Sequence, residues 1–444
     1  MSRAATRTIL VVVVSLATAA LLTSPATAQG WGRRACLAPN GVDDTVELQS
    51  ALERCSGGSS RCTVRLCRGV FRTSPVRVGD FRGVLRGARR GRTVIQALPE
   101  LQVNNNVPYW HDDPLDPGLD PWPYLVQFIG GRGEIRDLTI EIPTPPAGDR
   151  PTRGWHEMEI EGADPTLELG GAILITGRDP VAFEVSRVRV VAGSDPESYL
   201  DTTLISGVSF RGLLFNPADP GTFPVHPVRG QYRLSESELT GMVSGTQLGE
   251  LEGAEVEITR SDFQSLLAVD VLDGSRSRVS VNGNQWDAGF VGVQVILNVD
   301  GEPSQGNTFL VSRNRGTVGS YFGFGSGVYF ADPWILPVPG ESTLTVSSNR
   351  VTLGDGEGAA ASALEAYGAG QVRVWGDRFQ GRAATGVRLD QTSGCRVFWN
   401  ALSGLDTGSG PHLDLGRETS ACLAVVGAED IVNDDGTDNR IIRR

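Results

Sequence analysis

The feature that most constrains the fold is a short pattern that recurs along the second half of the chain. Each copy is an alternating apolar strand that ends at Asn, Asp or Gly, as in residues 310–314 and 344–349. The closing positions, with spacings of 22, 30, 35, 28, 23 and 27 residues, are Asp262, Asn284, Asn314, Asn349, Asp377, Asn400 and Gly427. A period in the twenties with a variable excess is typical of a solenoid whose insertions fall in loops.

Weaker copies of the same pattern lie upstream, at residues 135–142, 183–191, 204–210 and 232–239. A coil of two or three short strands cannot bury its apolar face alone, whereas stacked coils bury a continuous core. Stacked Asn side chains hydrogen-bond through the turns between strands. A β-propeller fits poorly, because its blades repeat at roughly 40–50 residues. We therefore expect an all-β parallel β-helix with its closing positions stacked about 4.8 Å apart.

One helix is expected before the first strand. Asp44 followed by Glu47 is a capping-box-like start, so Asp43 and Asp44 are interpreted as structural. An apolar stripe at helical spacing follows, formed by Leu48, Ala51, Leu52 and Cys55.

The beginning of the chain resembles a known family. Residues 40–52, then 62–71, and then 81–87 followed by 93–95, are similar to the helix and first coils of the pectate-lyase superfamily (pectin-lyase-like proteins). The resemblance implies a single-stranded right-handed parallel β-helix with a short N-terminal capping helix. Members of that superfamily include pectate and alginate lyases, polygalacturonases, epimerases and tailspikes, so the fold alone does not define a function.

The first 28 residues have the pattern of a signal peptide, with Arg3 and Arg7 before an apolar stretch and small residues before a cleavage point after Ala28. We expect a secreted protein, extracellular or periplasmic. Residues 29–444 are then one β-helix domain, with a cap and first coils at 36–100, loop-rich coils at 101–170 and regular coils at 171–444.

Charge and composition exclude one kind of catalysis and some classes of binding partner. All 40 basic residues are arginine, so lysine-based catalysis is excluded. The net charge is −12, and −14 without Arg3 and Arg7. So acidic a chain is a poor partner for nucleic acid, and no segment after the signal is long and apolar enough for membrane insertion.

Six cysteines in an exported chain predict three disulfide bonds. Cys395 and Cys422 open equivalent strands, and stacked strands would bring their Cα atoms within the range that a disulfide requires. Among the four N-terminal cysteines we favour Cys55 with Cys62 and Cys36 with Cys67, while the other pairings within this cluster stay open.

The motifs that identify the superfamily's enzymes are missing. The chain contains no Gly-His-Gly and no Arg-Ile-Lys, and the pectate-lyase segments with Trp-Ile-Asp-His and Arg-x-Pro-x-x-Arg do not occur. The sequence therefore leaves open whether the protein is an enzyme. If it is one, the resemblance implies a polysaccharide lyase or a glycoside hydrolase.

Two loops contain the residues best suited to a glycan. Aromatic faces stack on sugar rings, and the predicted substrate-binding side chains are Tyr109, Trp110, Trp122, Tyr124 and Trp155. The weak catalytic candidates are Asp112, Asp113, Asp116 and Asp120. Such acidic residues can also bind Ca²⁺ through oxygen, and no other cofactor or metal is expected. The alternative is that these loops are solvated excursions whose aromatic residues pin them to the solenoid.

Two function classes follow. In the first, the exported β-helix binds or processes a polysaccharide in a groove along the parallel sheet that faces residues 104–124 and 143–169. In the second, it is a non-catalytic envelope, adhesion or glycan-binding component. Both interpretations have a polysaccharide or cell-surface glycan as the partner.

Overall fold

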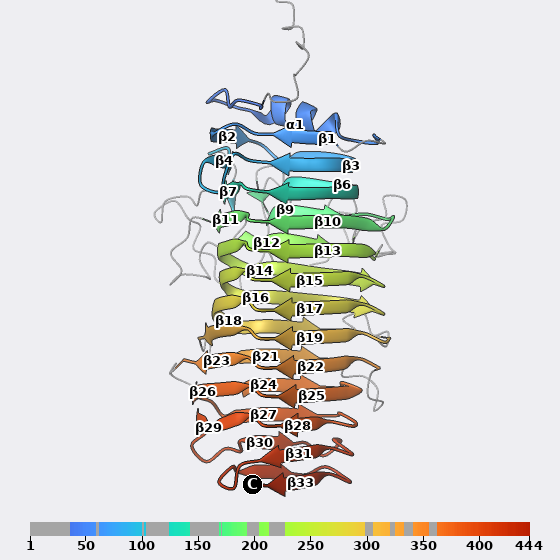
Figure 1. The fold of residues 1–444 in the computed structure, drawn as a ribbon, viewed down its shortest axis with the longest axis vertical. Helices are drawn as coiled ribbons and strands as arrows, with labels where there is room; N and C mark the ends of the chain where they lie inside the picture. Colours follow the sequence, from blue (N-terminus) through green and yellow to red (C-terminus); the bar gives the residue numbers. More distant parts are fainter. Residues whose placement is uncertain are drawn as a thin grey trace, which may run out of the picture. The chain divides into compact units, whose positions relative to one another are not determined.

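The computed structural model describes residues 36–58, 62–99, 102–103, 124–142, 168–169, 171–192, 204–212, 227–297, 305–319, 325–332, 341–354 and 362–444. Residues from Cys36 to Arg444 form one compact unit. It is a right-handed parallel β-helix that starts with a helix, α1 (Thr45–Glu53), so the predicted fold class is confirmed (Figure 1). No described helix is long and apolar enough to cross a membrane.

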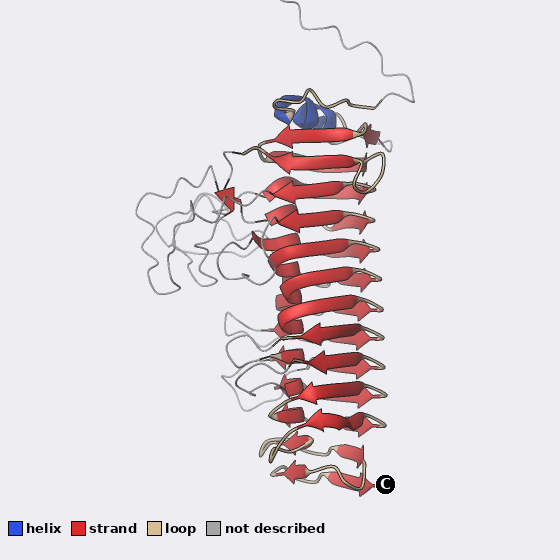
Figure 2. Ribbon diagram, turned by 90° about the vertical axis from the view of Figure 1, so that its left-hand side faces the viewer, coloured by secondary structure: helices blue, strands red, loops and turns tan. Residues whose placement is uncertain are grey.

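Each coil contributes strands to three parallel sheets, which we call sheets 1, 2 and 3 in the order in which a regular coil passes through them (Figure 2). Sheet 1 contains the most regular strands. They are β1 (Cys62–Arg65), the second parts of β3 (Val76–Arg86) and β6 (Tyr124–Arg136), β10 (Val181–Ser186), β13 (Gly230–Ser235), β15 (Glu255–Thr259), β17 (Arg278–Asn282), β19 (Thr308–Ser312), β22 (Thr343–Ser347), β25 (Gln371–Trp375), β28 (Arg396–Phe398), β31 (Leu423–Val426) and β33 (Arg440–Arg443).

Sheet 2 follows sheet 1 across a turn of three residues in the first coil, six in the second and two in each coil from β6 to β28. Its strands are β2 (Gly69–Thr73), β4 (Thr93–Ala97), β7 (Thr139–Ile142), β11 (Arg189–Ala192), the first parts of β14 (Glu238–Glu252), β16 (Asp262–Ser275) and β18 (Gln285–Ile296), β20 (Arg315–Val318), β23 (Arg350–Leu353), β26 (Arg378–Arg382) and β29 (Ala401–Asp406).

Sheet 3 completes the coil. Its strands are the first parts of β3 and β6, β9 (Gly171–Thr176), β12 (Leu204–Arg211), the later parts of β14, β16 and β18, β21 (Ser326–Ala331), β24 (Ser362–Tyr367), β27 (Thr385–Asp390), β30 (Leu413–Leu415) and β32 (Val432–Asp434). The long strands turn corners between sheets and so link 31 described strands into one ladder, while β5 (Gln102–Val103) pairs separately with β8 (Glu168–Leu169).

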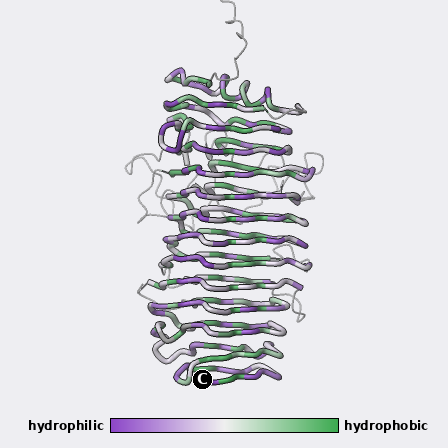
Figure 3. Tube along the Cα trace, in the orientation of Figure 1, coloured by the Kyte–Doolittle hydropathy of each residue, from purple (hydrophilic) through white to green (hydrophobic). Residues whose placement is uncertain are grey.

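The core follows from the alternation of apolar and polar residues along each strand, which Figure 3 shows coil after coil. In sheet 1, Val256, Val279, Phe309, Leu344 and Val372 occupy one register position and all are buried. Burying each such side chain stabilises the fold by roughly 1.5–3 kcal/mol. Stacking therefore places each of these inward side chains against an apolar side chain of the preceding coil and one of the next coil.

The helix begins where the sequence predicts and buries Leu48, Ala51 and Leu52 against the first coils. Its capping differs in detail from the prediction. The Asp44 carboxylate makes no cap hydrogen bond and instead accepts the backbone N–H groups of Asn40 at 2.6 Å and Arg72 at 3.1 Å. Asp43 accepts the Thr45 N–H at 2.9 Å. Both aspartates are structural, because they bind the helix start and the first coil.

A hydrogen-bonded ladder of buried side chains fixes the turn from sheet 1 to sheet 2. The backbone N–H of Asn284 donates to Asn314 Oδ1 at 2.9 Å, that of Asn314 to Asn349 Oδ1 at 3.0 Å, and that of Asn349 to Asp377 Oδ1 at 2.8 Å. Asn400 accepts the Asp377 N–H at 3.0 Å. The predicted stacking is therefore present at these five positions.

The ladder corrects one predicted position. Upstream of Asn284 its members are Ser261 and Ser237, and Asp262 is instead the first residue of β16. The residue before each ladder position has a positive φ, as at Arg260, Arg313 and Trp399. Glycine occupies this position only at Gly283 and Gly376, so the sequence indicates the left-handed turn at those two coils and not at the others.

All three predicted disulfides are present, Cys36–Cys67, Cys55–Cys62 and Cys395–Cys422, with Cα separations of 5.2, 5.3 and 4.4 Å. The backbone N–H of Leu423 donates to the Cys395 carbonyl at 2.9 Å, so Cys395 and Cys422 lie in register on consecutive coils, as expected.

Asp377 gives the ladder a pH dependence. The Asn members donate from Nδ2 to a carbonyl of the preceding coil, as Asn314 does to Val281 and Asn349 to Val311. The second carboxyl oxygen of Asp377, Oδ2, has no hydrogen-bond partner among the described residues. Burial raises the pKa of Asp377 to about 7, against the opposing effect of the hydrogen bonds from Asn349.

We predict that Asp377→Asn flattens the dependence of stability on pH. Between about pH 4 and pH 7 the unfolded wild type releases this proton while the folded state keeps it, so the free energy of unfolding falls as the pH rises. The variant should be more stable than wild type by about 2–4 kcal/mol at pH 8 and similar at pH 4. Urea unfolding at both pH values measures this. The reciprocal change, Asn314→Asp, should introduce the same fall, and parallel pH profiles for wild type and Asp377→Asn would contradict the assignment.

The Cys395–Cys422 bond should hold the last coils. Replacing both cysteines by serine is expected to lower the stability of that end by about 3 kcal/mol, because the disulfide closes a chain loop in the unfolded state. Amide hydrogen exchange should then accelerate in β30 to β33 while the coil of Asn284 stays protected. The Cys36→Ser/Cys67→Ser double variant is the control and should accelerate exchange at the opposite end. Equal acceleration along the whole solenoid would refute a local role.

Candidate functional site

The outward face of sheet 3 is the candidate site, and chain connectivity directs attention to it. The longer undescribed connections all begin or end at sheet 3, namely residues 104–123, 143–167, 193–203, 213–226, 298–304, 320–324, 333–340 and 355–361. The turn from sheet 1 to sheet 2 is short at every regular coil. Binding sites concentrate on loops that a rigid scaffold positions.

One column of residues runs along this outward face in register. Its members, from β6 to β32, are Gln127, Leu174, Ser209, Gln247, Asp270, Gln294, Tyr329, Glu365, Arg388, Asp414 and Asn433. Each alternates with inward apolar residues, as Gln294 does with Val293 and Val295. Most of this column is polar, in contrast with the core behind it.

The first part of the column belongs to a buried polar network. The Tyr124 hydroxyl lies 2.9 Å from Ser209 Oγ, and Ser206 donates to the same hydroxyl at 3.2 Å. Further along, Asp270 is fully buried and accepts hydrogen bonds from Ser244 at 3.2 Å and Gln294 at 3.0 Å. These groups hold neighbouring coils together through hydrogen bonds.

The second part is a half-buried cluster on β21, β24, β27 and β30, which we call the tyrosine cluster: Tyr329, Glu365, Tyr367, Arg388 and Asp414. The rings of Tyr329 and Tyr367 lie on adjacent coils with their centroids 6.4 Å apart. The Tyr367 hydroxyl donates to Glu365, and the Arg388 guanidinium lies 5.5 Å from the Tyr367 ring centroid. The cluster therefore offers two aromatic rings beside fixed charges.

In the tyrosine cluster, one guanidinium group lies between two carboxylates from neighbouring coils. Arg388 lies between Glu365, 3.7 Å from its Nη1, and Asp414, 3.6 Å from its Nε. Asn433 donates to Asp414 at 2.8 Å. Burial, and then the hydrogen bond to Glu365, raise the pKa of Tyr367, so its hydroxyl stays protonated. Burial and the charge of Glu365 raise the pKa of Tyr329 as well.

This geometry suits binding better than acid–base chemistry. Glu365 and Asp414 each form an ion pair with Arg388 and accept a hydrogen bond from a neutral donor. Glu365 lies on the coil before Arg388 and Asp414 on the coil after it. Half-exposed tyrosine rings supply apolar faces, while the carboxylates and the guanidinium supply acceptors and donors for hydroxyl groups. Within the described residues, no group of three or more His, Cys, Asp or Glu side chains is arranged to hold a metal ion.

Tyr124 is the predicted site residue that the structure describes. It opens β6 and is only 2% exposed, so its ring is engaged inside the buried network and presents no open face to a sugar. The other candidates, Tyr109, Trp110, Asp112, Asp113, Asp116, Asp120, Trp122 and Trp155, lie outside the described residues. Their segments join the end of sheet 2 to the start of sheet 3, at Tyr124 and at β9.

Sequence reasoning missed the tyrosine cluster. The number of residues between each ladder position and the corresponding sheet 3 strand varies, because connections such as 320–324 and 355–361 intervene. Tyr329 follows Asn314 by 15 residues, whereas Arg388 follows Asp377 by 11. No constant offset therefore aligns Tyr329, Glu365 and Arg388 before the fold is known.

Comparison with known proteins finds likeness in structure alone. No sequence-family profile matches the chain, and no curated protein sequence matches it. Among solved structures, it is similar to the A-module of the mannuronan C-5 epimerase AlgE6 of Azotobacter vinelandii, with 13% identity, coverage of 92% of this chain and 97% of that one, and a TM-score of 0.45.

Two further similar structures illustrate the range of activities on this architecture. PfbA, a surface adhesin of Streptococcus pneumoniae, shares 11% identity over 87% of this chain and 91% of its own, with a TM-score of 0.42. A polygalacturonase from Erwinia carotovora ssp. carotovora shares 13% over 91% and 92%, with a TM-score of 0.33. At these identities and TM-scores the likeness says nothing about activity, and the function has to be inferred from this chain's own residues.

Proposed function

We propose that the protein is a secreted β-helix that binds a polysaccharide or cell-surface glycan along the outward face of sheet 3. The observation that carries the proposal is the tyrosine cluster, with two rings on adjacent coils beside Glu365, Arg388 and Asp414. A linear glycan lying across the coils would stack on the rings and exchange hydrogen bonds with the charged groups. Three disulfides support an oxidising compartment.

Binding without catalysis is the version that the described residues favour. Glu365 accepts a hydrogen bond from Tyr367, Asp414 accepts one from Asn433, and both form ion pairs with Arg388, whereas a glycosidase needs one carboxyl group free to donate a proton. The sequence candidates for a catalytic pair are Asp112, Asp113, Asp116 and Asp120, in the segment that precedes Tyr124. A glycan lyase or hydrolase therefore remains the second candidate.

The first test is the double variant Tyr329→Ala/Tyr367→Ala. Each stacked ring contributes about 1 kcal/mol, so binding to a responsive glycan should weaken by roughly tenfold or more. Affinity electrophoresis in gels containing each polysaccharide identifies the glycan and measures the change. Trp375→Ala/Trp399→Ala removes two exposed rings elsewhere on the chain and is the matched control. Unchanged binding in the tyrosine variant would refute this site.

The second test concerns the connection before β6. If Trp110 and Trp122 form a sugar platform, alanine at both positions should weaken glycan binding while the melting temperature changes little. A large fall in melting temperature would instead identify them as residues that pack against the solenoid. Reducing ends and the absorbance of unsaturated products, measured on the same glycans, report hydrolysis and lyase activity respectively.

A further inference from the structure

Three arginines are stacked on the outward face of sheet 2. Arg315 of β20 pairs in register with Arg350 of β23, which pairs with Arg378 of β26. All three side chains are exposed. Neighbouring strands lie about 4.8 Å apart, so the Cα atoms of the three arginines fall within about 10 Å. Like charges directly opposite each other in a sheet are destabilising.

This arginine row has no ion pair with any described carboxylate. One other stacked pair has such a partner, whereas Arg82 with Arg132 and Arg373 with Arg396 form two-residue stacks that also lack one among the described residues. Arg86 and Arg136 also lie in register, and Asp137 Oδ2 is 3.1 Å from Arg86 Nε and 3.9 Å from Arg136 Nε. The chain itself thus shows that one carboxylate can serve two stacked guanidinium groups.

The pKa of Asp137 shows the electrostatic effect of the surrounding arginines. Burial opposes ionisation of this carboxyl, but the hydrogen bond from Arg187 at 2.7 Å and the charges of Arg187, Arg86 and Arg136 outweigh it and lower its pKa. At the arginine row of sheet 2 the guanidinium groups are present and the described chain supplies no equivalent of Asp137.

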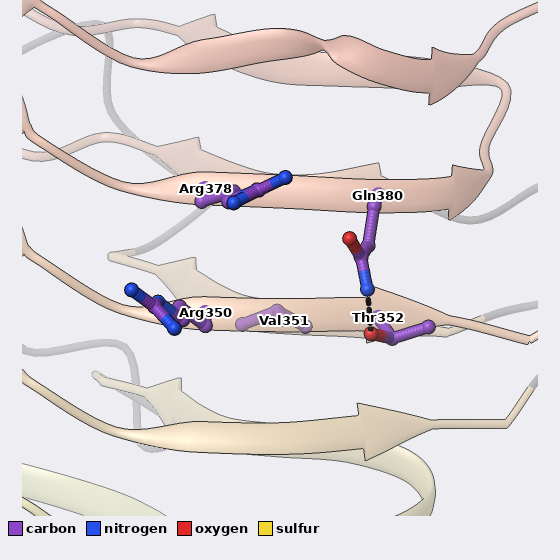
Figure 4. Close-up of a pocket in the computed structure, with 5 residues that line it drawn as sticks. All are labelled: Arg350, Val351, Thr352, Arg378 and Gln380. Carbon is purple, nitrogen blue, oxygen red and sulfur yellow. Dashed lines mark hydrogen bonds between the residues drawn. The ribbon is translucent and has the colours of Figure 1, made fainter.

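A shallow hollow of about 210 Å³ lies on the same surface, lined by Arg350, Val351, Thr352, Arg378 and Gln380. The side chains of Arg350 and Arg378 extend in opposite directions along their strands, which leaves the space between them open (Figure 4). Gln380 donates to Thr352 Oγ1 at 2.8 Å, so the threonine hydroxyl keeps its own proton for a ligand. The hollow therefore combines cationic groups with donors suited to hydroxyl groups.

We propose that this arginine row is a second ligand site, for a linear anionic glycan whose carboxylate or sulfate groups follow one another across the coils. Guanidinium groups bind such planar or trigonal oxyanions through paired hydrogen bonds, and Thr352 and Gln380 bind the sugar hydroxyls. Nucleic acid fits less well, because the outward residues of the row include no aromatic side chain to stack on bases. The site lies on a different sheet from the tyrosine cluster and does not depend on the proposed function.

The test is the triple variant Arg315→Gln/Arg350→Gln/Arg378→Gln. Isothermal titration measures binding of three oligosaccharides of equal length, which are carboxylated, sulfated and carboxyl-reduced. In low salt, the wild type should bind at least one anionic oligosaccharide, and the variant should bind it about tenfold more weakly or not at all. The carboxyl-reduced form should not bind at this site, and preference between the other two identifies the anionic group.

The matched control is Arg278→Gln/Arg373→Gln/Arg440→Gln, which removes the same charge from exposed arginines of sheet 1. It should bind like wild type and keep the wild-type melting temperature, while the arginine-row variant should melt at or slightly above the wild-type temperature because the repulsion between its stacked charges is removed. Equal loss in the two variants, no anionic binding by the wild type, or tighter binding of a single-stranded oligonucleotide would each overturn the proposal. The Tyr329→Ala/Tyr367→Ala variant should retain this anionic binding, so failure of one site is distinguishable from failure of the other.

Discussion

The structure depends on one side-chain interaction: the side-chain oxygen of each ladder residue accepts a hydrogen bond from the backbone N–H of the ladder residue in the preceding coil. Because Asn314 Oδ1 binds the N–H of Asn284, and Asn349 Oδ1 that of Asn314, the start of each sheet 2 strand is fixed relative to its neighbours. A slip of one residue would turn every inward side chain outward. The ladder and the apolar columns therefore specify the same register. In any other register the N–H groups of the turn would lose their side-chain acceptors, and the apolar side chains would leave the core.

The ladder runs along the turn from sheet 1 to sheet 2, and a shorter set of hydrogen bonds, from the Ala254 N–H to Ser277 Oγ at 3.1 Å and from the Ser277 N–H to Asn307 Oδ1 at 2.9 Å, joins coils at the corner between sheet 3 and sheet 1. From β6 onward the longer connections lie before or after a sheet 3 strand, while the turn that carries Asn284 to Asn400 stays short. Each coil resumes its register at the next ladder position, so a long connection costs little stability beyond its own loop-closure entropy. The ladder thus explains why both loops predicted to contact a glycan lead into sheet 3, and why the outward face of that sheet differs from coil to coil.

The sequence predicts the elements that repeat and misses those that depend on the variable corners. The positions of Asn284, Asn314 and Asn349 and the Cys395–Cys422 pairing follow from strand pattern alone, because equivalent positions of stacked strands must meet. Asp262 was assigned to the ladder in place of Ser261, since serine is a less distinctive stacking residue than asparagine. Glu365 and Arg388 were missed because connections of different length precede them. The arginine row, in contrast, was within reach of the sequence: Arg315, Arg350 and Arg378 each directly follow a ladder residue.

The residue that directly follows each ladder position can change from coil to coil without affecting the ladder and the core, which stabilise the solenoid. Along sheet 2 this position is occupied by Arg189, Glu238, Asp262, Gln285 and then the arginine row; Arg189 forms an ion pair with Glu238 at 3.0 Å, whereas the arginines of the row follow one another with no acidic residue between them. Burial, and to a smaller extent the neighbouring charges of Glu238 and Asp287, raise the pKa of Asp262. An arrangement selected for stability would interleave the two signs, as Asp137, Arg187, Glu236 and Arg260 do one turn away. The core and the ladder outweigh the repulsion of a few tenths of a kcal/mol per pair. The outward face of sheet 2 consequently tolerates the unpaired charges of the arginine row, and the proposed anionic site rests on this tolerance.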